Sequence, residues 1–266
     1  MRMLERIIRS TDFESQNPRI DHFVTTRSNG YSTSAYSSFN LGKWCGEDPE
    51  TTRFNYKLLG KELHIDSNNI IVPREVHSNE TVVIDEHFLR CGLVERERLL
   101  ATADALVTRL PCVAIGVTTA DCVPIIGYNS NDTIVAIHAG WRGIVAGVIE
   151  SAFKKMQEIS PSQDYRFLVG PCIDGDSYEV GEDVWQQFKD RFTAAEQDKI
   201  LRKRVGEKFF PDIRTAASIQ LEQHCRTNHI KQIQIDTYSN LNFYSVRRDG
   251  FKTGRFVTGI MLKGTN

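Results

Sequence analysis

Three short apolar runs in the middle of the chain constrain its fold more than any other feature. They are CVAIGV (112–117), VPIIGY (123–128) and TIVAIH (133–138), and they are rich in β-branched residues. Apolar and polar residues do not alternate in these runs, which is typical of strands that are buried on both faces. A chain of 266 residues is long enough to bury such strands without disulfide bonds.

Segments with helical periodicity alternate with these and other strands. Apolar residues recur at every fourth position over 141–159, which predicts a helix with one buried stripe. The other predicted helices cover 48–63, 181–192 and 212–225. The other predicted strands cover 20–26, 70–76, 81–85, 166–170, 230–236 and 256–262. This order predicts an α/β fold, in a single domain, with a mixed and largely buried sheet.

The charge balance and the N-terminus limit the partners that we expect. The chain has 33 Lys and Arg residues against 34 Asp and Glu residues, so no overall basic field favours nucleic acid. No run of 18 apolar residues predicts a transmembrane helix, and the charged N-terminus lacks the apolar region of a signal peptide. We therefore expect a cytoplasmic protein that binds neither nucleic acid nor membranes. The six cysteines form no CxxC pair and are expected to be reduced thiols.

Three residues that can bind a metal stand near the ends of predicted strands. They are His77 in EVHS, Cys122 in TTADC and His138 in AIHAGW. Strand ends of this kind converge on the ligand crevice of an open sheet, so we expect the three side chains to meet there. Two imidazoles and one thiolate suit zinc, and three protein ligands leave a fourth position open for water or substrate.

The same residues allow two other interpretations. Cys122, His138 and Asp121 could form a nucleophilic thiol–imidazole–carboxylate set, in which case no metal would occupy the thiolate. The histidines and the cysteine could also be ordinary buried residues. Asp104 and Asp121 flank the region, and either could orient a histidine, act as a general base or cap a turn.

Arginines stand where they could bind an anion. Arg27 ends the first predicted strand, and Arg142 follows His138 by four residues. Three more arginines, Arg247, Arg248 and Arg255, lie in SVRRDGFKTGR (245–255). A guanidinium group matches the oxygens of phosphate or carboxylate, although a solvated hairpin would carry the same charges. Neither a P-loop nor a GxGxxG motif is present, so nucleotide binding through those loops is unsupported.

A set of motifs resembles the YfiH-like laccase-domain family. The most specific are ADALVT (103–108), TTADCVPI (118–125) and AIHAGWRG (136–143). Further matching segments are TTRSNG (25–30), SSFNLG (37–42), GPCI (170–173), YEVG (178–181), DIRTAA (212–217), TYSN (237–240) and RRDGFKTGR (247–255). The resemblance extends over nearly the whole chain, from about residue 20 to residue 262.

This resemblance implies a fold and several activities. The fold would be a single α/β/α sandwich domain over 20–266, preceded by an N-terminal extension over 1–19. Members of the family that the chain resembles cleave adenosine, inosine, guanosine or methylthioadenosine with phosphate, and some deaminate adenosine. Alternatives are a copper-dependent polyphenol oxidase (laccase), a cysteine hydrolase, or a protein of peptidoglycan quality control. A laccase reaction needs several copper ions and many more histidines than the 7 of this chain. Zinc is therefore the expected metal.

Site residues follow from the same resemblance. It implies that His77, Cys122 and His138 bind zinc. Three residues are expected to act in catalysis: Cys122, Asp121 and Arg142. Four are expected to bind the purine nucleoside or phosphate: Arg27, Asn40, Tyr238 and Arg248.

The chain departs from the family pattern at several positions. Asn29 stands where a glycine is usual, Glu75 where glutamine is common, and Asp236 where a cysteine often precedes TYS. Residues 174–177 replace a stretch that usually contains Gly, Pro and Cys. If Glu75 and Asp236 face the pocket, their negative charge could alter substrate preference. None of the three metal ligands is missing.

Overall fold

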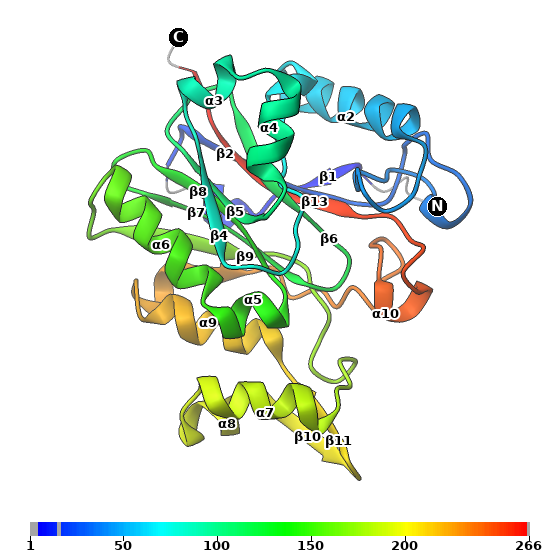
Figure 1. Cartoon of the computed structure of the whole chain (residues 1–266), viewed down its shortest axis with the longest axis vertical. Coiled ribbons are helices and arrows are strands. Elements are labelled where there is room, and N and C mark those ends of the chain that lie inside the picture. Colours follow the sequence, from blue (N-terminus) through cyan, green and yellow to red (C-terminus); the bar gives the residue numbers. More distant parts are fainter. Residues whose placement is uncertain (1–4, 15–16, 265–266) are drawn as a thin grey trace.

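Two packed β-sheets form the centre of the computed structural model, which describes residues 5–14 and 17–264 (Figure 1). The five-stranded sheet has the order β1 (Ile7–Ile8), β2 (Ile20–Thr25), β13 (Phe256–Leu262), β6 (Ala114–Thr119) and β3 (Ile70–Ile71). The six-stranded sheet has the order β12 (Ile230–Gln232), β9 (Tyr165–Val169), β7 (Val123–Asn129), β8 (Ile134–Ala139), β5 (Ala103–Thr108) and β4 (Glu80–Ile84). Both sheets mix parallel and antiparallel pairs; in the second, β7 and β8 are antiparallel neighbours and β4 runs parallel to β5.

The two sheets pack face to face, and alternate residues of their central strands lie between them. Residues of this inner layer include Ile115 of β6, Ile126 of β7, Ala136 of β8 and Ile260 of β13. The intervening residues of β8, Val135 and Ile137, belong to a different cluster that faces the helices. Since a sheet covers one face and helices cover the other, these strands have no polar face, which explains their continuous apolar sequences.

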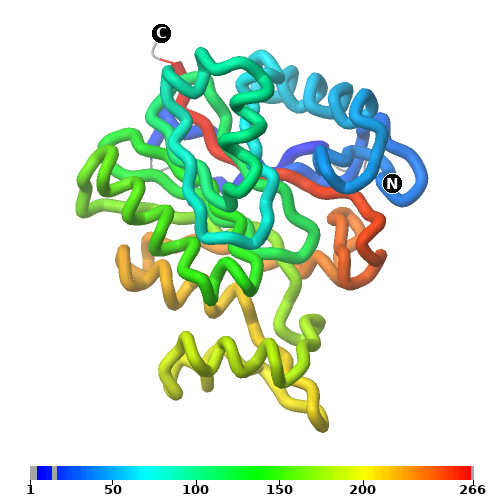
Figure 2. The backbone as a smooth tube through the Cα atoms, viewed as in Figure 1, coloured from blue at the N-terminus to red at the C-terminus, as the bar shows by residue number. Residues whose placement is uncertain are grey.

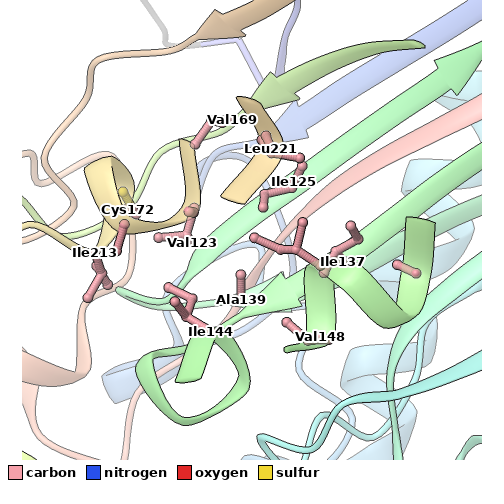
Figure 3. Close-up of a cluster of buried hydrophobic side chains, with 14 of the residues drawn as sticks. Val123, Ile125, Ile137, Ala139, Ile144, Val148, Val169, Cys172, Ile213 and Leu221 are labelled. Atoms are coloured by element: carbon pink, nitrogen blue, oxygen red, sulfur yellow. The ribbon is translucent and has the colours of Figure 1, made fainter. Parts of the chain in front are cut away.

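Helices cover the outer face of each sheet. Figure 3 shows side chains of β7 and β8 packed against α5 (Trp141–Ala146), α6 (Val148–Ile159) and α9 (Ile213–Glu222). On the five-stranded sheet, α2 (Pro49–Leu63) packs Leu59 against Phe23 and Val257. The N-cap residue Asp48 accepts a hydrogen bond from the Thr51 N–H group and thereby fixes the start of α2. The layers therefore follow the order helix, sheet, sheet, helix.

The remaining elements lie around these layers. They are α1 (Thr11–Glu14), α3 (Glu86–Arg90), α4 (Leu93–Leu100), α7 (Glu182–Arg191), α8 (Ala194–Ile200), α10 (Val246–Asp249) and the 3-10 turns Ser34–Tyr36, Ser67–Asn69 and Thr227–His229. The strands β10 (Leu201–Val205) and β11 (Lys208–Pro211) form a hairpin that follows α8. Together with α7 and α8, this hairpin forms a projection at the lower end of the tube in Figure 2. No helix in the described part of the chain is both long and apolar enough to cross a membrane.

The predicted mixed α/β single domain is confirmed, with differences where tertiary contacts replace the local pattern. The buried strands divide into two sheets rather than one, because a second sheet covers an apolar face as well as helices do. The helix predicted over 141–159 is interrupted at Gly147, whose φ of 83° separates α5 from α6. The strands predicted over 70–76 and 230–236 stop at Ile71 and Gln232.

The expected N-terminal extension is described in part. Residues 1–4 and 15–16 lie outside the described ranges. Ile7 and Ile8 pair with Thr25 and Val24 of β2, so this short segment adds a strand to the five-stranded sheet. The buried Phe13 packs its ring edge-on against His22.

Candidate metal centre

The side chains of His77, Cys122 and His138 meet at one place, beside the start of β7 and the end of β8. Their ligand atoms all lie within 4.8 Å of one another, and Cys122 Sγ is 3.6 Å from His77 Nε2. The β7–β8 register explains the meeting of two of them, because Val123 is opposite Ala139 and Pro124 opposite His138, beside Cys122. His77 comes from the loop between β3 and β4, whose path the sequence pattern did not reveal.

The buried carboxylate of Asp104 holds both histidines. Its oxygens accept hydrogen bonds from the N–H groups of Val76 (3.0 Å), His77 (2.9 Å) and Ser78 (2.7 Å). Its Oδ1 also lies 2.7 Å from Nδ1 of His138, which leaves Nε2 of that ring as the ligand atom. The loop after Ile71 therefore directs its N–H groups to Asp104 and not to a neighbouring strand.

Charges at the centre favour the metal-binding form of the cysteine. Burial raises the pKa of the Cys122 thiol, but the His138 and His77 imidazoles lower that pKa by more, to below its ordinary value. For His138, burial lowers the pKa while the Cys122 and Asp104 side chains raise it, and the net pKa is raised. A thiolate beside imidazoles is the form in which cysteine binds metals.

Close packing at Gly140 fixes the position of the His77 ring. A Cβ atom built on Gly140 would lie 2.5 Å from His77 Cδ2 and 3.1 Å from Cys122 Sγ. No real side chain tolerates the shorter of these contacts without a shift of its neighbour. The glycine at the start of α5 is therefore required by the space that the two ligands occupy.

Asp121 lies beside the metal ligands but does not bind His138. Its carboxylate accepts hydrogen bonds from Thr237 Oγ1 and from the N–H group of Arg247, both at 2.7 Å. Burial raises its pKa to about 6. Because His138 pairs with Asp104, the carboxylate of a Cys122–His138 set would be Asp104 and not Asp121.

A cavity of ≈ 570 Å³ opens onto the three ligands. Its lining combines positive, acidic and aromatic side chains. The positive residues are Lys43, Arg74, Arg247 and Arg255; the acidic residues are Glu75 and Asp121; the aromatic residues are Trp44, Trp141, Tyr178 and Phe251. Glu75 accepts hydrogen bonds from the Thr118 N–H group (2.7 Å) and hydroxyl (2.9 Å), while burial raises its pKa to about 7. Glu75 therefore lines the pocket, whereas Asp236, the other acidic departure from the family pattern, is not among the lining residues.

Two of the arginines expected to bind phosphate are held by other parts of the chain. The guanidinium group of Arg248 donates to the main-chain carbonyls of Thr237, Tyr238 and Phe243 and pairs with Asp249. Arg27 donates to the Ser37 carbonyl, and its Cζ lies 4.7 Å from the centre of the Tyr244 ring. Neither Arg248 nor Arg27 is among the residues that line the cavity.

Three further expected site residues, Asn40, Tyr238 and Arg142, also lie outside the lining. Asn40 is fully buried, and its Oδ1 accepts hydrogen bonds from the N–H groups of Gly42 (2.9 Å) and Arg255 (2.7 Å). Tyr238 is 39% exposed on the surface. Arg142 is exposed and lies over Trp141, with Cζ 4.4 Å from the ring centre, so it contacts a residue of the cavity lining.

Sequence reasoning did not single out three of the residues that line the cavity. Lys43 directly follows the SSFNLG segment, Arg74 precedes His77 by three residues, and Tyr178 opens the YEVG segment. Proximity to those segments was the available signal. It did not distinguish these residues from neighbours that point elsewhere, because that depends on how the loops fold.

The donor set fits a single zinc ion better than a cluster of copper ions. A thiolate and two imidazoles are usual zinc ligands, and three protein ligands leave one position for a substrate atom. Any group of at least three His, Cys, Asp or Glu side chains can hold a metal when its ligand atoms lie close together. Across residues 5–14 and 17–264, only His77, Cys122 and His138 come close enough together to do so.

Comparison with known proteins shows the family of the chain. A purine nucleoside phosphorylase of Bacteroides thetaiotaomicron is 33% identical over 253 residues, which cover 93% of each chain. Adenosine deaminase RL5, from an unknown prokaryotic organism, is 34% identical over 267 residues, which cover 95% of this chain and 97% of that protein. The crystal structure of a Neisseria meningitidis protein has a TM-score of 0.83 and 27% identity, covering 98% of this chain and 100% of that one. Since residues 21–263 match the corresponding family model, the chain belongs to the family described as multi-copper polyphenol oxidoreductase laccase.

Proposed function

We propose that the chain is a zinc-dependent purine nucleoside phosphorylase, which transfers the pentose of a purine nucleoside from the base to inorganic phosphate. One observation carries this proposal: the three-donor group of His77, Cys122 and His138 opens onto a cavity lined by positive side chains. The printed name of the Bacteroides relative, at 33% identity, supports the reaction class.

Each donor of the metal group suits zinc. Cys122 supplies a thiolate, His77 and His138 supply imidazole nitrogens, and Asp104 fixes both histidines. Zinc bound there would supply a Lewis acid that polarises a substrate atom. Oxidation of phenols by several copper ions is less well supported, because the described residues offer one such donor group.

The proposed reaction exchanges one bond at the sugar for another. A phosphate oxygen forms a bond to C1′ of the pentose while the bond from C1′ to the purine nitrogen breaks. The bonding electrons leave with the purine, which takes up a proton, and the sugar acquires oxocarbenium character. We assign that proton to Asp121, since it lines the cavity and its pKa is raised by burial to about 6.

Aromatic side chains of the cavity would bind the base. Trp141 and Tyr178 line it, and the guanidinium groups of Arg142 and Arg247 lie over their rings at 4.4 and 5.0 Å. Such cation–π contacts hold the rings in place. We therefore propose that Arg142 acts on the reaction by positioning Trp141.

Deamination of adenosine is the second candidate. In this reaction a water oxygen replaces the amino group at C6 of the purine, and ammonia leaves. The relative named adenosine deaminase, at 34% identity, favours it. The same cavity and the same three donors serve both reactions, so one chain can carry out both.

Product analysis separates the candidates. Purified protein is incubated with inosine or adenosine, with and without phosphate, and bases and sugar phosphates are measured by chromatography. The proposal predicts phosphate-dependent release of hypoxanthine with an equal amount of ribose 1-phosphate, lost after chelation and restored by zinc. Release of base that does not depend on phosphate, or full activity after removal of all metal, would contradict it. Conversion of adenosine to inosine establishes the second activity.

A further inference from the structure

We propose that Lys43, Arg74 and Arg255 form the phosphate subsite of this cavity, in place of Arg27 and Arg248. The inference rests on the proposed function for the identity of the phosphate as co-substrate. The site itself is argued from the charges and contacts of these three side chains, all of which line the cavity.

The three cations form no close ion pair in the described part of the chain. Within the described ranges, neither Lys43, Arg74 nor Arg255 forms an ion pair, whereas Arg27 and Arg248 both pair with Asp249. Arg255 uses Nη1 for the main-chain carbonyls of Thr253 and Gly254, which leaves Nε and Nη2 free for a ligand. Glu75 and Glu97 act on Lys43 only from beyond ion-pair distance, so all three cations keep charge that an anion would neutralise.

A buried amide holds together the two chain segments that carry Lys43 and Arg255. Asn40 Oδ1 accepts the N–H groups of both Gly42, which precedes Lys43, and Arg255. The Leu41 N–H group also donates to the Arg255 carbonyl at 3.0 Å. A Cβ atom on Gly42 would lie 2.7 Å from Arg255 Cγ, so the two segments are in direct contact. Asn40, expected from the sequence to bind substrate, thus acts by positioning this pair.

The charge of the whole lining favours an anion. Four positive residues line the cavity (Lys43, Arg74, Arg247 and Arg255) against Glu75, Asp121 and the Cys122 thiolate, so positive side chains remain in excess. Lysine supplies a point charge and arginine a planar fork of donors, a combination that suits the tetrahedral oxygens of phosphate. The phosphate group could belong to inorganic phosphate or to a nucleotide, and the test distinguishes the two sources.

Charge-removing variants test the subsite. Lys43→Met and Arg255→Met are compared with wild type by calorimetric titration with inorganic phosphate and by the KM for phosphate with inosine as the second substrate. Loss of one hydrogen bond to a charged group predicts a weakening of roughly ten- to hundredfold in both measurements. The zinc content and the KM for inosine should stay at wild-type values, and Lys43→Arg should restore phosphate binding.

The chain offers a matched control. Lys203 lies 4.7 Å from the centre of the Phe210 ring, the same distance as Lys43 from the Tyr56 ring, but it stands on the projecting hairpin outside the cavity. Lys203→Met should therefore bind phosphate as wild type does. Equal losses in Lys43→Met and Lys203→Met would overturn the subsite.

The outcomes separate the subsite from the proposed function. Phosphate binding that weakens in the two variants supports the subsite even if inosine is not cleaved, a result that would refute only the phosphorylase. Wild-type phosphate affinity in both variants overturns the subsite even if phosphorolysis occurs. Competition between inosine 5′-monophosphate and phosphate, with the same loss in Lys43→Met, would assign the subsite to the phosphate group of a nucleotide. Phosphate binding without such competition assigns it to the inorganic ion.

Discussion

Asp104→Asn changes one atom of the side chain that holds both histidines of the metal centre. The carboxylate is fully buried and accepts the N–H groups of Val76, His77 and Ser78, while Oδ1 also meets Nδ1 of His138. An amide has only one acceptor oxygen. Whichever carboxylate oxygen the NH₂ group replaces, it therefore faces N–H donors.

The contacts give the size of the effect. If the amide nitrogen replaces Oδ2, the N–H groups of Val76 and Ser78 lose their acceptor. If it replaces Oδ1, the N–H group of His77 and Nδ1 of His138 lose theirs. Two unsatisfied buried donors at roughly 1–3 kcal/mol each lower the free energy of unfolding by about 2–6 kcal/mol. Loss of a partner behind a metal-binding histidine also weakens metal binding by about ten- to hundredfold.

Urea unfolding and zinc titration against a chromophoric chelator measure the two effects. Asp212→Asn is the matched control, because Asp212 is also buried and accepts the N–H groups of Arg214 and Thr215, far along the chain from the metal ligands. We expect Asp212→Asn to lose stability but to bind zinc as wild type does. Wild-type zinc affinity in Asp104→Asn, or an equal loss in both variants, would refute the role of Asp104.

Three further predictions follow from packing, burial and hydrogen bonding. Gly140→Ala should weaken zinc binding by about tenfold or more through displacement of His77, measured by the same titration; Gly92→Ala, also at a helix N-cap but with open space around it, should not. Burial lowers the pKa of His22 from 6.5 to about 4, so the unfolded chain binds the proton better between these values. Unfolding free energy should therefore fall by about 2 kcal/mol from pH 7 to pH 5, and His22→Gln should remove this loss. Arg248→Met should lower the unfolding temperature, because three main-chain carbonyls lose their donor. The KM for phosphate should not rise in this variant. A selective rise in that KM would show that Arg248 belongs to the phosphate site.

The buried strands and the places of Cys122 and His138 near strand ends could be predicted from local pattern, whereas His77 lies on a loop and its role as a ligand followed from the family resemblance. Continuous apolar runs identify strands with two covered faces, and Cys122 and His138 stand beside the ends of such runs. What covers each face is not encoded locally. Val135 faces helices and Ala136 faces a second sheet, yet both are simply apolar in the sequence.

The arginines show the limit of sequence reasoning at the site. Arg248 and Arg255 stand in the same basic segment, and both suit phosphate by residue type. The carbonyls of Thr237 and Phe243 occupy the first, while the second keeps donors free. Which guanidinium is free depends on loops that come together from distant parts of the chain.

Metal analysis of the purified protein tests the central claim most directly. Zinc and copper are measured per chain by inductively coupled plasma mass spectrometry in wild type, in Cys122→Ser and in Cys112→Ser, whose cysteine is exposed and does not line the cavity. We predict one zinc ion per chain in wild type and in Cys112→Ser, and its loss from Cys122→Ser. Full zinc content in Cys122→Ser would show that these three side chains do not hold the ion.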